Sequence, residues 1–175
     1  MVAGSFSIEI ESPVEAKRLW KATVDTHNLL PKQAPALVLF KVMEELAPFD
    51  TLSSLQRHCL LLIIRYEIKI VIAANKDFSY MKEKVDLVDE ANLVYGYSPV
   101  EGGMLGEKVA SVSHKIKYTL KPEGNGGCIT TFTCDYDNLP GVPQDEAKIE
   151  EIKAKNTGLF KQVEEYLIAN PTLYC

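Results

Sequence analysis

The alternation of apolar and polar positions predicts strands at the start and in the middle of the chain. In SFSIEIES, Phe6, Ile8 and Ile10 alternate with serine and glutamate, which is typical of a strand with one buried face. The turn EGNGG supplies the Asn and Gly that positive φ angles favour, so it predicts a hairpin between KVASVSHKIKYTLKP and CITTFTCDY. The first of these two strands would have one face formed by Val112, His114, Ile116 and Tyr118.

Two short helices are expected after the first strand. Ser12 and Pro13 predict a helix start, with serine as N-cap and proline at the first helical position. That amphipathic helix would extend to about Thr23. A second would occupy residues 25–30 and stop at Pro31, because proline lacks the backbone N–H that a helix interior needs.

A long helix is expected from about residue 144 to 169. The side chains of one helix face recur there at spacings of three and four. They are Ile149, Ile152, Asn156, Leu159, Phe160, Val163, Tyr166 and Leu167, with the polar Asn156 interrupting an otherwise apolar face. The order of strand, two short helices, many strands and one long helix predicts an α+β domain, with the apolar face of the sheet covered mainly by the last helix.

The most apolar stretch, CLLLIIRYEIKIVIA at residues 59–73, raises the question of a membrane anchor. A span needs about 20 mostly apolar residues, and this run is shorter and contains Arg65, Glu67 and Lys69. These charges alternate with Tyr66 and three isoleucines, so the run from Arg65 predicts a half-buried strand. For residues 60–64 strand and buried helix stay open, because the run does not alternate.

Composition narrows the class of protein. With 175 residues, 46% of them hydrophobic, the chain is expected to form one domain over residues 1–175. A formal charge of −5, with basic residues scattered among acidic ones, argues against nucleic-acid binding. The N-terminus lacks the features of a secretory signal, so a cytoplasmic location is expected, with the nucleus as a second compartment. The four cysteines form no CxxC pair and lack nearby histidines, so neither a metal nor a cofactor is expected.

Several motifs resemble one plant family. HNLLPK, FSYMKEKVDLVD, YSPVEGGMLGEK, NGGCITTFTCDY, LPGV and VEEYLIANPTLY are similar, in this order, to segments of the plant class 10 pathogenesis-related proteins, the family of the major birch pollen allergen (Bet v 1). The resemblance implies a helix-grip fold: a curved seven-stranded antiparallel sheet around a long C-terminal helix, with two short helices and an internal apolar cavity. Residues 46–73 depart from the family pattern, since they lack its glycine-rich loop and loop lysine.

The resemblance also implies where a ligand would bind. From spacing alone, the aromatic residues of the strands are expected to be ordinary core. The resemblance changes this interpretation and implies a cavity wall formed by Phe78, Tyr80, Tyr95, Tyr97, Ile116 and Phe132. The expected ligand-binding set also contains Asn28, Leu30, Asn156, Leu159 and Val163. Gly158 indicates either a bend or close sheet contact, or room for a ligand.

The function that follows is a monomeric, defence- or stress-related binding protein for small amphipathic plant molecules: cytokinins, flavonoids, sterol-like or abscisic-acid-like hormones. No nucleic acid or membrane is expected as a partner. One alternative is a lyase-type condensing enzyme resembling norcoclaurine synthase, which would need a lysine and a carboxylate as acid and base. Another is a weak ribonuclease using Glu101, Glu164 and Tyr166, although the missing loop lysine favours a solvated surface for these residues. No catalytic Cys–His pair is evident.

Overall fold

The computed structural model describes residues 2–26, 29, 41–45, 66–71, 80–122 and 126–175, with only the backbone of 41–45 and 66–71. Its strands and helices are β1 (Val2–Ser12), α1 (Ala16–Val24), β2 (Lys41–Glu45), β3 (Tyr66–Val71), β4 (Tyr80–Asp89), β5 (Val94–Gly102), β6 (Val109–Leu120), β7 (Cys128–Asn138) and α4 (Glu146–Ala169). The strand expected from residue 65 is confirmed as β3. The second short helix and most of the divergent segment fall outside the described residues.

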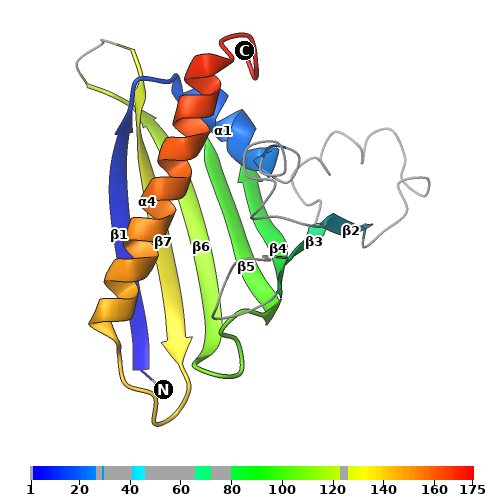
Figure 1. Cartoon of the computed structure of the whole chain (residues 1–175), viewed down its shortest axis with the longest axis vertical. Coiled ribbons are helices and arrows are strands. Elements are labelled where there is room, and N and C mark those ends of the chain that lie inside the picture. The colour runs from blue at the N-terminus through cyan, green and yellow to red at the C-terminus, as the bar shows by residue number, and fades with distance from the viewer. Residues whose placement is uncertain (1, 27–28, 30–40, 46–65, 72–79, 123–125) are drawn as a thin grey trace.

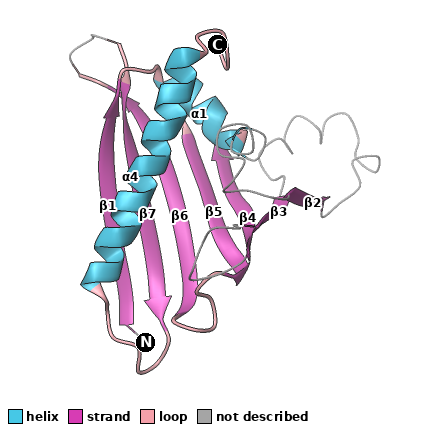
Figure 2. Cartoon of the chain, in the orientation of Figure 1, coloured by secondary structure: helices cyan, strands magenta, loops and turns pink. Residues whose placement is uncertain are grey.

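The described strands form one antiparallel sheet in the order β1-β7-β6-β5-β4-β3-β2. Figure 1 shows α4 lying along one face of this sheet, with α1 near the C-terminal end of α4. Figure 2 shows the same arrangement as a single layer of strands with the long helix across it. The predicted α+β class, seven-stranded sheet and long C-terminal helix are therefore confirmed.

The inner face of the sheet, which is turned towards α4, is the face that the alternation predicted. Phe6, Ile8 and Ile10 of β1 lie in register with Cys134, Phe132 and Thr130 of β7. On β6 the residues Val112, His114, Ile116 and Tyr118 lie in register with Tyr136, Cys134, Phe132 and Thr130 of the same β7 face. Helix α1 closes one end, where Trp20 is buried and its indole N–H donates to the carbonyl of Val94 at 3.3 Å.

The predicted start of the first helix is wrong by three residues. Ser12 is the last residue of β1, and its hydroxyl accepts a hydrogen bond from the backbone N–H of Val14 at 3.1 Å. It therefore caps the turn that follows the strand. The helix begins at Ala16, with Glu15 at the N-cap position and no side-chain cap.

Helix α4 is capped at its N-terminus by Asp145, whose carboxylate accepts from the backbone N–H of Lys148 at 3.0 Å. At its C-terminal end no basic residue of its own lies in the last turn. Arg18 of α1 supplies the cation instead: its guanidinium donates to the carbonyls of Leu167, Asn170 and Leu173 at 2.9, 3.1 and 3.0 Å. A cation at this end is favourable because the helix dipole leaves partial negative charge there.

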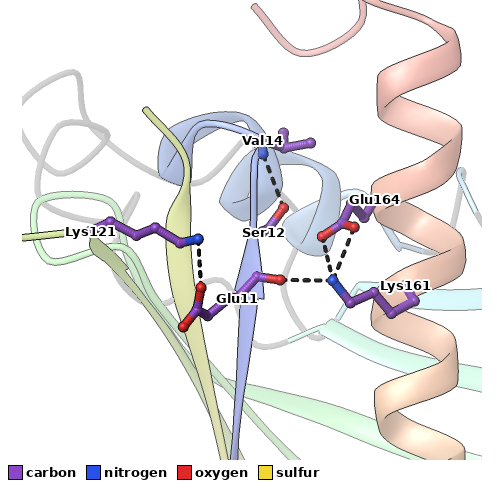
Figure 3. Close-up of polar contacts among 6 residues, drawn as sticks. All are labelled: Glu11, Ser12, Val14, Lys121, Lys161 and Glu164. Atoms are coloured by element: carbon purple, nitrogen blue, oxygen red, sulfur yellow. Dashed lines mark hydrogen bonds and ion pairs between the residues drawn. The ribbon is translucent and has the colours of Figure 1, made fainter. Parts of the chain in front are cut away.

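A second polar link joins α4 to the end of β1 (Figure 3). The ammonium of Lys161 donates to the backbone carbonyl of Glu11 at 2.7 Å and to both carboxylate oxygens of Glu164 at 3.0 Å. On the other side of β1, Lys121 pairs with the Glu11 carboxylate at 2.8 Å. Glu164 is 9% exposed, so its charge is satisfied by Lys161 rather than by bulk water.

Strands β5 and β6 pair over a short length only. Their register covers Val94–Tyr97 and His114–Lys117, although both strands continue beyond it. Past Tyr97 they lie beside a surface pocket of about 740 Å³ that is lined by residues of β1, β5, β6 and β7. Among the described helices, none is long and apolar enough to span a membrane.

Candidate functional site

The inner face carries a row of aromatic rings that crosses three neighbouring strands and reaches α4. Ring centroids are 5.8 Å apart for Tyr95 and Tyr97, 4.8 Å for Tyr97 and His114, 5.4 Å for His114 and Phe132, and 6.1 Å for Phe132 and Phe160. We call these five residues the aromatic ladder. The strand register builds it, because Tyr97 lies opposite His114 and aromatic pairs at such spacings attract one another.

His114 is the polar member of the ladder. Burial lowers the pKa of His114 from 6.5 to about 4, although the charge of Asp135 acts in the opposite direction. The imidazole is therefore neutral at physiological pH. Its Nδ1 is buried and has no hydrogen-bond partner, which is uncommon for a buried side-chain atom and costs free energy.

Glu83 places a carboxyl group beside the ladder. Across the β4–β5 pair, Val85 lies opposite Tyr97 and Glu83 lies opposite Pro99, two residues further along the same face of β5. Lys82 faces the other way, towards the exposed Glu101, with which it forms an ion pair at 2.7 Å. Glu83 is half-buried, and burial raises the pKa of its carboxyl from 4.5 to about 7.

The carboxyl group of Glu83 affects the pKa values of two tyrosines of the ladder. Burial raises the pKa of both Tyr95 and Tyr97, and the charge of Glu83 raises the two pKa values further. Both phenols therefore stay protonated at physiological pH. They can donate hydrogen bonds and present the faces of their rings to a bound molecule.

The two buried thiols are inert. Cys134 lies opposite His114 in the register of β6 and β7, but burial raises its pKa to about 12, and that of Cys128 to about 11. A thiol that stays protonated is neither a nucleophile nor a metal ligand. In the described ranges, no group of three or more His, Cys, Asp or Glu side chains could hold a metal ion.

Four of the predicted ligand-binding residues come together on the inner face: Tyr95, Tyr97, Ile116 and Phe132. Val163 joins them from α4 and is 9% exposed. Leu159 is half-buried on the same helix. Asn28, Leu30 and Phe78 lie outside the described residues, and their role stays a prediction.

Two other predicted residues have different surroundings. The hydroxyl of Tyr80 donates to the carboxylate of the exposed Glu101 at 2.8 Å. This places Tyr80 with the outward-facing polar groups of β4 and β5 and away from the ladder. The amide of the half-buried Asn156 donates to the carbonyl of Ile152 in its own helix at 2.9 Å.

Gly158 does not pack against the sheet, and its role as a bend or as room for a ligand stays a prediction. It is exposed, and a Cβ atom added there would meet nothing within 4 Å. The acidic residues considered for a nuclease are also engaged separately: Glu101 with Lys82 and Tyr80, and Glu164 with Lys161.

Sequence reasoning missed Glu83, His114 and Phe160 as members of this site. The signal for His114 was present, since it alternates with Val112 and Ile116 in one strand. Glu83 gave no such signal, because it stands between Lys82 and Lys84 and looks like part of a solvated charged run.

Comparison with known proteins agrees with this architecture. The sequence model of the Pathogenesis-related protein Bet v 1 family matches residues 68–170. Pathogenesis-related protein STH-21 of Solanum tuberosum is 32% identical over 171 residues, and Major strawberry allergen Fra a 1.07 of Fragaria ananassa is 33% identical over 171 residues; each alignment covers 97% of both chains.

Solved structures show the same fold. The crystal structure of Ara h 8.0201 aligns with a TM-score of 0.69 at 25% identity and covers 96% of this chain and 99% of its own. A norcoclaurine synthase point mutant from Thalictrum flavum, in complex with a transition-state analogue, aligns with a TM-score of 0.71 at 16% identity over 98% of both chains. At that identity the likeness concerns the fold alone.

Proposed function

Since the chain belongs to the Bet v 1 family of pathogenesis-related proteins, we propose that it is a cytoplasmic, defence-related protein that binds a small amphipathic molecule between the inner face of its sheet and α4. The aromatic ladder is the observation that carries this proposal. Aromatic side chains with a few placed polar groups are typical of small-molecule sites. The buried free thiols of Cys128 and Cys134 suit a reducing compartment.

The ligand classes that suit the site are flat and partly polar: cytokinins, flavonoids, sterol-like molecules and abscisic-acid-like hormones. The ladder offers ring faces for stacking, while Glu83, Tyr95 and Tyr97 offer polar groups along one side of it. Burying such a ligand would gain about 25 cal/mol per Å² of apolar surface removed from water.

Binding of the neutral fluorescent probe N-phenyl-1-naphthylamine tests the proposal. We expect saturable fluorescence enhancement from a protein that also melts cooperatively. We also expect molecules of the ligand classes named above to displace the probe. Enhancement without a cooperative melt would indicate exposed surface in a molten state. That result would contradict the proposal.

Catalysis is supported less well than binding. A condensing enzyme needs an acid and a base in contact with its substrates; within the described part of the chain no lysine forms an ion pair with Glu83, whose pKa is raised by burial. A structure of the norcoclaurine synthase from Thalictrum flavum holds dopamine and hydroxybenzaldehyde, so these compounds form the natural assay. Product formed from dopamine and an aldehyde would favour the enzyme.

A further inference from the structure

We propose that the outer face of the sheet, which is turned away from α4, holds a second binding site, and that its ligand is a short oligosaccharide of amino sugars. The site is the surface pocket beside β5 and β6, whose volume of about 740 Å³ is typical of small-molecule sites. It lies on the opposite face from the aromatic ladder. The inference therefore goes beyond the proposed function and does not depend on it.

The pocket lies where two neighbouring strands stop pairing. The register of β5 and β6 ends at Tyr97 on β5. Near the start of β6 its register with β7 shifts between Val109 and Ser111, and such a bulge bends a strand and interrupts its ladder. Residues 98–100 of β5 and 110–113 of β6 form two sides of the pocket, and β7 and β1 extend it across the sheet.

The polar lining consists of serine and aspartate side chains that lie next to one another on β1, β7 and β6. Asp135 lies between Ser5 and Ser113 in the register, and the hydroxyl of Ser5 donates to its Oδ1 at 2.6 Å. Asp137 lies beside Ser111, whose hydroxyl donates to its Oδ2 at 2.9 Å. A carboxylate offers about four acceptor positions, so each aspartate can accept further hydrogen bonds from a ligand.

The protein does not neutralise these two carboxylates. No lysine or arginine lines the pocket, and within the described part of the chain neither Asp135 nor Asp137 forms an ion pair. Lys108 and Lys115, which flank the lining residues of β6 in the sequence, are not part of the lining. An anionic ligand would meet like charge here, whereas a protonated amine gains charge-assisted hydrogen bonds. The pocket therefore favours a cation over an acid.

The remaining lining favours a ligand that also carries hydroxyl groups. Ser98 and Ser113 add side chains that can both donate and accept hydrogen bonds. Much of the lining is exposed, including Ser5, Ser113 and Asp135, so an apolar ligand would bury little surface there. A chain of amino sugars presents ammonium and hydroxyl groups along its length, which matches a polar pocket that extends across four strands.

Three disaccharides that share one skeleton and differ in the substituent at carbon 2 test this directly. They are the glucosamine disaccharide, which is cationic, and two neutral relatives, N,N′-diacetylchitobiose and cellobiose. By NMR titration of isotope-labelled protein at pH 6, we expect the glucosamine disaccharide to shift the backbone amides of Ser111, Ser113 and Asp135 saturably. It should bind about fivefold more tightly than either neutral disaccharide, and the amide of Phe160 in the ladder should not shift.

A pair of matched variants tests the role of the carboxylates. Asp135→Asn combined with Asp137→Asn removes both charges and keeps the shape of the side chains, so the advantage of the glucosamine disaccharide should disappear. Glu9→Gln changes an exposed carboxylate of β1 that is not part of the lining, and the advantage should remain. If the double variant fails to fold, the three disaccharides on the unmodified protein decide alone.

Other outcomes would overturn the inference. Equal affinity for the three disaccharides, or no saturable binding of any of them, would remove the site for amino sugars. Putrescine carries two ammonium groups and no hydroxyl, so binding as tight as that of the glucosamine disaccharide would contradict a sugar ligand. Displacement of N-phenyl-1-naphthylamine by the disaccharide would place the ligand on the inner face. Failure of the probe alone to bind would overturn the proposed function and leave the outer site standing.

Discussion

The rings of Tyr97 and His114 lie 4.8 Å apart across the short paired stretch of β5 and β6. This contact joins the tyrosines of β5 to the phenylalanines of β7 and α4, so the ladder is continuous only through it. It also places a neutral imidazole with an unpartnered nitrogen next to a tyrosine that is influenced by Glu83.

Ligand affinity should depend on Tyr97 much more than on Tyr118, although the two lie on neighbouring strands of the same face. Tyr97→Ala should weaken probe binding by about 1–3 kcal/mol, since it removes a wall of the site. Tyr118 is buried, and its hydroxyl shares a hydrogen bond with Thr23 at 2.5 Å. Tyr118→Phe should therefore lose about 1 kcal/mol of stability with unchanged affinity. Fluorescence titration and urea unfolding measure the two quantities, and equal losses of affinity would contradict the assignment.

Stability should fall in acid because of His114. Its pKa is lowered from 6.5 to about 4 in the folded state, so the unfolded chain binds the proton more tightly between these values. The stability that depends on neutral His114 is fully present above pH 6.5 and is lost as pH falls towards 4, by up to about 3 kcal/mol. His114→Gln should lose this component of the pH dependence in urea unfolding from pH 7 to 4. A variant with the unchanged acid profile would show that His114 is solvated.

The contribution of Glu83 to stability should depend on pH in the opposite direction to that of His114. Its pKa rises from 4.5 to about 7 on folding, so the folded state holds the proton more tightly. The favourable contribution is full below pH 4.5 and is lost as pH rises through 7. Glu83→Gln should therefore stabilise the ligand-free protein at pH 8, by up to about 3 kcal/mol, with little effect at pH 4. Asp86→Asn, at an exposed position of the same strand, should leave the free energy of unfolding nearly unchanged at both pH values.

The C-terminal end of α4 should depend on Arg18. Arg18→Gln removes charged donors from the carbonyls of Leu167, Asn170 and Leu173 and should lower the free energy of unfolding by about 2–3 kcal/mol. Within the described residues, the neighbouring Lys17 forms an exposed ion pair with Glu90 at 3.1 Å. Lys17→Gln should therefore cost at most about 0.5 kcal/mol. Similar melting temperatures for both variants would show that water replaces the Arg18 contacts.

Two adjacent glycines of the β6–β7 hairpin should respond differently to the same change. Both have positive φ, 73° at Gly126 and 85° at Gly127. A Cβ at Gly127 would clash with the carbonyl oxygen of Ser12, whereas at Gly126 it meets nothing within 4 Å. Gly126→Ala should cost about 1 kcal/mol through backbone strain alone, and Gly127→Ala clearly more, by thermal melting. An equal cost would mean that the chain near Ser12 can move aside.

Much of this fold was predictable because β1, β6 and β7 alternate between the two faces of the sheet and α4 repeats its apolar positions every three or four residues. The prediction from the local sequence was wrong where one side chain can make two different capping hydrogen bonds. Ser12 can cap a helix or a turn, and only its place at the end of β1 decides between them. Tyr80 and Glu83 could not be assigned to a face from the pattern, because the β4–β5 pair contains two register irregularities, between Lys82 and Glu83 and between Val85 and Leu87, and each shifts the alternation.

The long helix is secured unevenly along its length. Its buried residues, Val163, Glu164 and Leu167, all lie in the C-terminal half, and that half also receives Arg18 and the link through Lys161. The side chains of the N-terminal half are half-buried or exposed, and none of them is buried. Helix α4 is therefore held to the rest of the molecule mainly at its C-terminal end, and its first turns should unfold locally more easily. Its backbone amides should exchange with deuterium slowest near Leu167 and fastest in the first turns after Glu146.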